Sequence, residues 1–398
     1  MDNNMYYKLL AEENITGQIS EDDIELLWHH NLLAYAYPYL VNTTYYDAEM
    51  AIEIRMKSQL NFLKDLNDLY QIIEAFNAKQ IEYRVIKGFV VAATYPRPYS
   101  RVMGDNDILI KKQTFNQAKE ILEELGYSCD LDIHTYKDVT FLKDQCLPIE
   151  LHYGLLNPDR ESNAQSLFDS MWVGQVDLAI EDMNFSAPLP KEHFRYLVFH
   201  MLKHMKSGGI GLRYLVDLKN FSEANNIDVV GEYDYFDKLG YGKLYRGFIS
   251  LCVYKLNMEL KDKECLISID DPDLELLGTA MIVNGLFGTT DDESKVNHHL
   301  SRYMTDGERT YNGHLIMSAL FPKAQQLSSR FSYAKQRNWL LPAAWIHRLL
   351  RIIFIKELRE NAGIMIRLKD DSTMRDRIKL MKAFELTDSE DEHDLPID

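Results

Sequence analysis

The chain has 398 residues, 46% of them hydrophobic and 26% charged, and its formal net charge at pH 7 is -17. This composition is typical of a globular protein with two or three domains. The acidic balance argues against a nucleic-acid substrate, because such substrates are recognised through clustered Lys and Arg. Four cysteines without metal-ligand spacing indicate reduced, buried thiols and no disulfide framework.

The sequence predicts a cytoplasmic protein without a membrane span. The most apolar stretch, Trp339 to Phe354, is interrupted by a histidine and two arginines. Residues 1–13 carry early acids and lack the apolar core of a signal peptide. The end of the chain, residues 387–398, holds six acids and no Lys or Arg, so we expect a disordered acidic tail.

Residues 1–80 are predicted to form an N-terminal helical segment. Helices are expected in residues 1–45, with Pro38 as a break, and a long amphipathic helix is expected from Tyr46 to Asn77. The apolar residues of that long helix recur three or four positions apart: Ile52, Met56, Leu60, Leu63, Leu66, Leu69, Ile73 and Phe76. This pattern indicates a packing element.

Residues 81–187 are predicted to form a catalytic domain around a small sheet. The apolar segment Tyr83 to Ile86 is expected to be a strand that runs through Lys87 and Gly88 into a short helical patch. Glycine at such a junction lets the backbone approach a ligand, and the exposed amides at a helix start favour an anion such as a phosphate. Lys87 and Arg101 would add positive charge for a phosphoryl group.

Three acids in this region have the pattern of a metal site. Asp105 and Asp107 precede the apolar triplet Ile108 to Ile110, and the period of a strand puts both carboxylates on one face. Two neighbouring carboxylates repel each other unless a cation lies between them. Glu150, on a later apolar strand, would supply a third oxygen ligand for Mg²⁺.

The remaining elements of this region complete a mixed sheet of four or five strands with helices on one side. Further strands are expected at Val139 to Leu142, at Leu147 to Leu151 and, as a fifth, at Tyr127 to His134; a helix is expected at Gln113 to Leu125. The stretch from Asn157 to Ala187 looks irregular, and Pro188 and Pro190 mark a domain boundary.

Residues 188–386 are predicted to form a C-terminal helical domain. The expected helices are Glu192 to Lys206, Leu212 to Asn225, further helices up to about Met258, Asp273 to Leu286, Ala334 to Leu358 and Ser372 to Phe384, with a polar loop from Gly288 to Gly307. The predicted fold class is therefore α+β, with a small mixed sheet embedded in a mainly helical chain.

These residues resemble a known family. The order strand, glycine, helix, Asp-x-Asp strand and later acidic strand is similar to the DNA polymerase beta-like nucleotidyltransferase superfamily. More narrowly, the chain resembles the bacterial uncharacterised nucleotidyltransferases at Lys87-Gly88, Tyr95, Pro98, Arg101, Asp105-x-Asp107 and Ile149-Glu150-Leu151-His152. The superfamily's usual glycine-serine after the first strand is Gly88-Phe89 here, which removes one hydroxyl ligand for phosphate.

The resemblance implies a nucleotidyltransferase that uses an NTP and two Mg²⁺ ions. Asp105 and Asp107 would bridge the ions, and Glu150 would complete the second ion's site and help to deprotonate the acceptor. Lys87, Gly88 and Arg101 would hold the triphosphate. The acceptor hydroxyl would belong to a small molecule, a sugar or a protein.

Four further residues are candidates for the substrate pocket. His152 lies one strand period from Glu150, so it would reach the phosphates or act as a base. His200 and His204 lie four apart on a predicted helix, which is zinc-ligand spacing but lacks the glutamate of an HExxH motif. Arg213 lies four residues before Asp217, and this run resembles a helical segment of the same family.

Two other functions remain open from the sequence. The chain could be a regulatory module that binds a nucleotide without chemistry, although the presence of all three acids favours an enzyme. It could also adenylylate a partner protein, as the resemblance to antitoxin-type nucleotidyltransferases allows.

Overall fold

The computed structural model describes residues 3–129, 137–156, 163–207, 210–283, 321, 332–335, 338–354 and 379–386. The chain divides into two compact units. The first comprises Met1–Met201, Arg213–Gly231 and Leu251–Lys263, and the second comprises Leu202–Leu212, Glu232–Ser250 and Glu264–Asp398. The predicted α+β class is confirmed. The domain boundaries expected at residues 80/81 and 187/188 stay predictions.

A four-stranded mixed sheet lies in the first unit. Its strands are β3 (Tyr83–Ile86), β4 (Asn106–Ile110), β5 (Asp138–Phe141) and β6 (Ile149–His152), in the order β3-β4-β6-β5. β4 runs parallel to β6, whereas the pairs β3/β4 and β5/β6 are antiparallel. The predicted strands at residues 83–86, 139–142 and 147–151 are thus confirmed. A fifth strand is expected at Tyr127 to His134. Within that range Ser128 forms an isolated β-bridge with Leu142. Residues 130–136 lie outside the described part of the chain.

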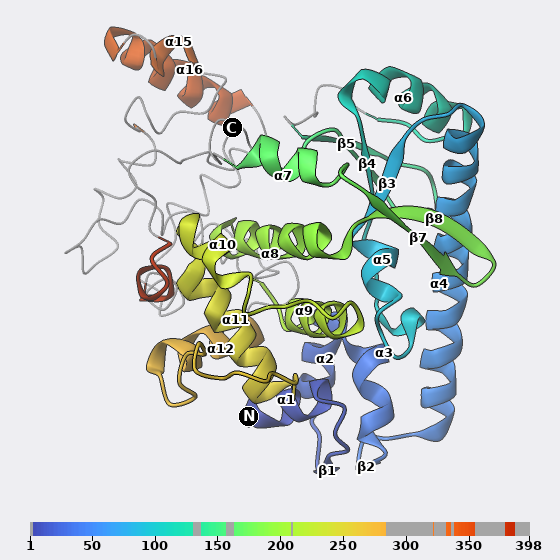
Figure 1. Cartoon of the computed structure of the whole chain (residues 1–398), viewed down its shortest axis with the longest axis vertical. Helices are drawn as coiled ribbons and strands as arrows, with labels where there is room; N and C mark the ends of the chain where they lie inside the picture. Colours follow the sequence, from blue (N-terminus) through green and yellow to red (C-terminus); the bar gives the residue numbers. More distant parts are fainter. Residues whose placement is uncertain are drawn as a thin grey trace. The chain divides into compact units, whose positions relative to one another are not determined.

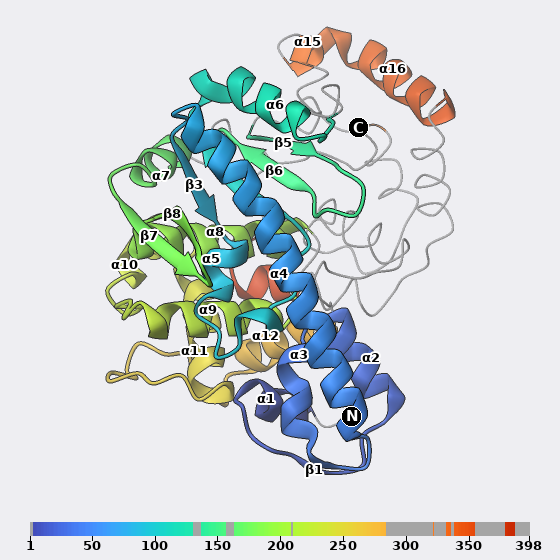
Figure 2. The same cartoon turned by 90° about the vertical axis from the view of Figure 1, so that its right-hand side faces the viewer.

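Helix α4 (Ala48–Ala78) is a long helix of 31 residues beside the sheet (Figures 1 and 2). Asp47 caps it, because the Asp47 side chain accepts a 2.7 Å hydrogen bond from the Met50 amide. The predicted helix is confirmed, and part of its apolar stripe packs against the rest of the first unit. The second half of the stripe, from Leu66 to Phe76, is buried, whereas the first half, from Ile52 to Leu63, is exposed, with Leu60 65% exposed. Periodicity reports an apolar face and does not show whether a neighbour covers it.

The N-terminal segment is helical, as expected, and belongs to the first unit. Its elements are α1 (Asn3–Leu10), β1 (Thr16–Gly17), α2 (Glu21–His29), α3 (Leu33–Ala36), the 3-10 helix η1 (Tyr37–Leu40) and β2 (Asn42–Thr43). Ser20 and Asp23 form a capping box at the start of α2, in which each side chain accepts from the other residue's backbone amide.

The prediction of irregular structure from Asn157 to Ala187 is wrong for the described residues after 162. They form α7 (Ala164–Ser170) and a hairpin of β7 (Gln175–Ile180) and β8 (Met183–Pro188), and β8 lies beside β3. The hairpin turns at Glu181, which has a positive φ of 50°. A turn without Asn-Gly or Asp-Gly lacks the strongest hairpin signal, which explains why the hairpin is missed.

Helices dominate the described residues after 189. They are α8 (Pro190–Ser207), α9 (Arg213–Ala224), α10 (Tyr233–Lys238), α11 (Gly242–Lys255), α12 (Pro272–Val283), α15 (Ser332–Lys335), the 3-10 helix η8 (Asn338–Leu340) and α16 (Leu341–Phe354). This confirms the helical character predicted there. The loop expected at 288–307 and the acidic tail at 387–398 lie outside the described residues. Among the helices that the structure describes, none has the length and apolar character to cross a bilayer.

Candidate active site

Two of the predicted acids meet across the centre of the sheet. In the parallel pair of β4 and β6, Asp107 lies directly opposite Glu150. Because side chains alternate along a strand, His152 lies on the same face of β6 as Glu150. Its Nε2 atom is 2.7 Å from Oδ1 of Asp107 and 3.2 Å from Oε2 of Glu150. Asp107 and His152 are almost fully buried, and the Glu150 side chain is 28% exposed.

Lys87 completes this cluster from the end of β3. Its Nζ atom lies 2.5 Å from Oδ1 of Asp107. Burial by itself would raise the pKa of Asp107, but the Lys87 ammonium and the hydrogen bond from His152 bring it below its usual range. The same ion pair raises the pKa of Lys87 against the effect of burial. Asp107 is therefore ionised at neutral pH.

Asp105 lies one residue before β4, and not on the strand as predicted, because β4 begins at Asn106. The pKa of Asp105 is raised to about 6, first by the negative charge of Asp107 and then by burial. The charges of Lys87 and Arg213 oppose this rise. Asp105 is thus electrostatically coupled to Asp107, and the pair is unfavourable unless more positive charge is added.

Sequence reasoning missed Asp138 and Lys137. Asp138 is the register partner of His152 across β5 and β6, and its Oδ2 atom lies 3.6 Å from Nδ1 of His152. The ammonium of Lys137 pairs with the same carboxylate. No local motif marks these two residues, because the pairing of β5 with β6 alone brings them to the site.

The cluster fits a divalent cation. Asp107, Glu150 and His152 each offer a ligand atom, and these atoms all lie within 4.8 Å of one another. The second carboxylate oxygen of Asp107, Oδ2, is buried without a hydrogen-bond partner among the described residues. Buried carboxylate oxygens are normally satisfied, so this atom is suited to a bound ion.

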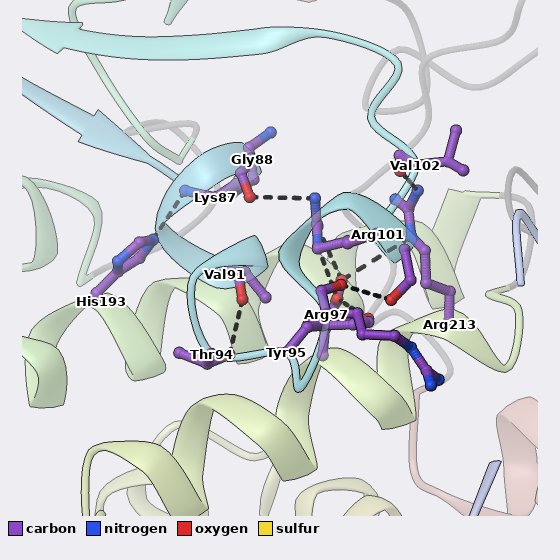
Figure 3. A network of polar contacts seen from close by, with 12 residues as sticks. Lys87, Gly88, Val91, Thr94, Tyr95, Arg97, Arg101, Val102, His193 and Arg213 are labelled. Carbon is purple, nitrogen blue, oxygen red and sulfur yellow. Dashed lines mark hydrogen bonds and ion pairs between the residues drawn. The ribbon is translucent and has the colours of Figure 1, made fainter. Parts of the chain in front are cut away.

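The Lys87-Gly88 turn has a strained backbone. Lys87 has φ 53° and ψ -123°, a combination that favours glycine. Its amide donates a 2.8 Å hydrogen bond to Nε2 of the buried His193 (Figure 3). Burial lowers the pKa of His193 to about 3, so this ring is neutral and accepts the bond. Strain of this kind is found where the surroundings hold a functional segment in place.

Gly88 begins α5 (Gly88–Ala92), which confirms the helical patch predicted here. At five residues, α5 is too short for its dipole to carry the anion argument made from the sequence. A Cβ atom on Gly88 would lie 3.8 Å from Sδ of Met103 and 3.9 Å from the carbonyl oxygen of Asp105, which are ordinary contacts. Neither packing nor the backbone angles require glycine at position 88. A glycine here is therefore explained by a ligand that lies close to the backbone.

Arg101 is fully engaged inside the protein (Figure 3). Its Nε and Nη2 atoms donate to the two oxygens of Asp217 on α9, at 2.7 and 2.9 Å. Its Nη1 atom donates to the Gly88 carbonyl at 3.3 Å. Tyr95 donates to the same Asp217 carboxylate at 2.6 Å. All three guanidinium nitrogens of Arg101 therefore brace the glycine turn and α9.

Arg213, the first residue of α9, has donor capacity left. Its Nη1 atom donates to the Val102 carbonyl at 2.7 Å, close in the chain to Asp105 (Figure 3). Its Nε atom is buried without a hydrogen-bond partner among the described residues and lies 3.9 Å from Oδ2 of Asp217. Burial and the nearby Arg101 lower the pKa of Arg213. A buried cation with a spare donor is suited to an anionic ligand.

The tyrosine-rich N-terminal segment contacts the same loop. The Tyr35 ring packs edge-on against Tyr95 at a centroid distance of 5.5 Å. Arg97 donates to the Tyr35 carbonyl at 3.1 Å and lies over the Tyr39 ring. The N-terminal segment therefore stabilises the loop that carries Tyr95 and Arg101.

His200 and His204 lie on α8 with the predicted spacing. The His200 ring lies near Tyr196 and Tyr214, at centroid distances of 6.3 and 6.0 Å, whereas His204 belongs to the second unit. Within the described ranges, the group of potential metal ligands contains neither histidine. Nothing in this part of the chain therefore supports the zinc alternative.

The chain was compared with family models, curated proteins and solved structures. A family model described as "Uncharacterised nucleotidyltransferase" matches residues 23–252, which is more than half of the chain. No curated protein matches. Among solved structures, the chain is similar to the lincomycin-bound lincosamide antibiotic adenylyltransferase LnuA, at 16% identity and a TM-score of 0.28. The match covers 39% of this chain and 95% of that one, and at this score it says nothing about the substrate.

Proposed function

Because the chain belongs to the uncharacterised nucleotidyltransferase family, we propose that it transfers a nucleoside monophosphate from an NTP to an acceptor hydroxyl. It is thus an enzyme of the class that transfers phosphorus-containing groups. The observation that carries the proposal is the pairing of Asp107 with Glu150 across β4 and β6, with Asp105 one strand period before Asp107. These three acids are the ones that two-ion phosphoryl chemistry needs.

Asp105 and Asp107 would hold one divalent cation together with the triphosphate, and Asp107 and Glu150 would hold a second. Mg²⁺ is the ion expected at carboxylate and phosphate oxygens. When bound, such cations neutralise the triphosphate and acidify the acceptor hydroxyl. The unpartnered Oδ2 atom of Asp107 supports this assignment.

The reaction is an in-line displacement at the α-phosphorus. The acceptor oxygen forms a bond to the α-phosphorus, and the bond from that phosphorus to the bridging oxygen breaks. The electron pair of the broken bond leaves with pyrophosphate. Glu150, which keeps partial access to solvent, takes the hydroxyl proton.

Lys87, Gly88 and Arg213 are proposed as contacts of the triphosphate. We assign this role to Arg213 and not to Arg101, because all three guanidinium nitrogens of Arg101 donate to Asp217 or to the Gly88 carbonyl. Two observations support the assignment to Arg213: its Nε atom has no hydrogen-bond partner among the described residues, and its charge lowers the pKa of Asp105. Arg101 instead positions the glycine turn.

The first test is thermal stability with each of the four NTPs, with and without Mg²⁺. We expect one NTP to raise the Tm of the wild type only when Mg²⁺ is present, and not to raise the Tm of Asp105→Ala/Asp107→Ala. Glu120→Ala, an exposed acid on α6 (Phe115–Glu124), is the matched control and should behave as the wild type. Stabilisation that is independent of metal and of the two acids would overturn the assignment.

The acceptor is a small molecule, a sugar or a protein, and a label in the α-phosphate distinguishes them. Incubation of the enzyme with the stabilising NTP and a lysate should produce a labelled product that Asp107→Ala does not produce. Label on a protein band identifies a protein-adenylylating type of enzyme, and label in the low-mass fraction identifies a small acceptor. Binding without any labelled product would support the nucleotide-binding module instead.

A further inference from the structure

We propose that His152 is itself a metal ligand, and that the ion held by Asp107, Glu150 and His152 is a first-row transition-metal ion such as Mn²⁺ in preference to Mg²⁺. This inference deepens the proposed function, because it concerns the second of the two ions proposed there. It assigns that ion a nitrogen ligand in place of an all-oxygen set.

The positions of the three side chains suit one ion. The Nε2 atom of His152 lies 2.7 Å from an oxygen of Asp107 and 3.2 Å from an oxygen of Glu150. Ligands held about 2.1 Å from an ion lie about 3 Å apart at neighbouring corners of an octahedron. The same nitrogen therefore has both carboxylates at the separation of ligands around a single cation.

The other ring nitrogen of His152 faces a carboxylate. Its Nδ1 atom lies 3.6 Å from Oδ2 of Asp138, and no other partner of Nδ1 is found among the described residues. In the metal-free protein Nε2 donates its proton to Asp107. An ion would replace that proton, and a proton on Nδ1, directed at Asp138, would leave the Nε2 lone pair for the ion. With an ion bound, these residues would form the carboxylate–histidine–metal arrangement, in which the outer carboxylate sets the tautomer and the ring orientation.

The frame that holds these groups is rigid. Asp107, Glu150, His152 and Asp138 lie on the three hydrogen-bonded strands β4, β6 and β5, in register with one another. His152 is fully buried, so its ring is confined by packing. The Glu150 side chain is partly exposed, so the cluster has contact with solvent at this carboxylate. Sites built on strands hold their ligands more precisely than sites on loops.

The ligand types decide the ion. Mg²⁺ binds oxygen and keeps several waters, whereas imidazole nitrogen suits first-row transition-metal ions. Among these ions, Mn²⁺ is the one that also suits carboxylate oxygens, so it matches a site of two carboxylates and one imidazole. A His152 that served only as a hydrogen-bond donor to the two acids would leave the site with oxygen ligands alone. The two cases therefore differ in whether a nitrogen atom is bonded to the ion.

The test is pulsed electron paramagnetic resonance of Mn²⁺ bound to the full-length protein, without nucleotide. We expect modulation from a directly bonded ¹⁴N in the wild type and in His29→Gln, a partly exposed histidine on α2 that serves as the control. We expect none in His152→Gln. Absence of the nitrogen signal from the wild type, or its persistence in His152→Gln, would overturn the proposal.

Equilibrium titration supplies a second readout. The wild type should bind Mn²⁺ at least about tenfold more tightly than Mg²⁺, and His152→Gln should lose most of this preference. Asp138→Asn should keep the nitrogen signal but bind Mn²⁺ about 10- to 100-fold more weakly. Equal affinities of the wild type for the two ions would contradict the proposed selectivity.

The two proposals fail in different ways. If no nucleotide is transferred but Mn²⁺ shows the His152-dependent nitrogen signal, the proposed reaction is wrong and the metal ligand stands. If transfer occurs and depends on the acids but the nitrogen signal is absent, the reaction stands and His152 is not a ligand.

Discussion

The Lys87 ammonium lies 2.5 Å from Oδ1 of Asp107, and both side chains are buried. The protein thus neutralises its central acid with a cation from the end of β3 before any ion binds. A buried charge without such a partner is costly, so this pair protects the fold when no ion is bound.

Lys87→Met is expected to destabilise the metal-free protein by about 3–5 kcal/mol, because it leaves Asp107 buried without its closest cation. Added Mn²⁺ should recover part of this loss, since the ion supplies the missing charge. The measurement is urea denaturation with chelator and with Mn²⁺. Lys119→Met, which removes a surface pair with Glu123, should cost no more than about 1 kcal/mol, with no metal dependence.

Gly88→Ala is expected to keep the free energy of unfolding within about 1 kcal/mol of the wild type, because a Cβ atom there makes only ordinary contacts. The KM for the NTP should nevertheless rise about tenfold or more if the ligand backbone lies against this glycine.

A glycine elsewhere provides the contrast to Gly88. A Cβ atom on Gly247 would lie 2.8 Å from Cδ2 of Leu277, so Gly247→Ala should destabilise the fold. An unchanged KM in Gly88→Ala would mean that the substrate does not approach this turn.

Arg101 and Arg213 form a matched pair for separating a bracing role from a binding role. Arg101→Met removes two bonds to Asp217 and should cost about 3–5 kcal/mol of stability. Arg213→Met removes one bond to the Val102 carbonyl, so its stability loss should be smaller, about 1–3 kcal/mol. Only the Arg213 variant should weaken NTP binding by about tenfold or more while the protein remains folded.

Calorimetric titration of the NTP at a temperature at which both variants are folded makes this comparison. If Arg213→Met kept full NTP affinity and folded Arg101→Met lost it, Arg101 and not Arg213 would be the residue that contacts the triphosphate.

His193 should make stability depend on pH. Its pKa in the fold is about 3 against 6.5 for the free side chain, because burial penalises the charged ring. The unfolded chain therefore takes up a proton below pH 6.5 while the folded chain does not. The stability contribution of His193 is complete above pH 6.5 and falls by about 1.4 kcal/mol per pH unit as the pH drops toward 3.

His193→Gln lacks this titration, so the advantage of the wild type over the variant should shrink steadily from pH 7 to pH 4. Urea denaturation of both proteins at each pH measures it. A constant difference across this range would show that His193 is not buried in its neutral form.

Much of the site follows from local pattern. The apolar segments Tyr83 to Ile86 and Leu147 to Leu151 predict strands. Asp105, Asp107 and Glu150 are recognisable because they adjoin or interrupt such apolar segments. The β7/β8 hairpin is missed, because its turn at Glu181 has no sequence signal of the usual kind. Local pattern also cannot show that the first half of the α4 stripe is left exposed.

The sequence by itself determined the α+β class, the long helix before the sheet, the Lys87-Gly88 turn and the three acids, because each depends on side-chain spacing within a few residues. Only the tertiary structure decided what these residues contact. Asp217 lies 116 positions after Arg101 and accepts hydrogen bonds from its guanidinium group. The register of β5 and β6 places Asp138 opposite His152. Strand pairing and helix packing join residues far apart in the chain, and no local pattern encodes such distances.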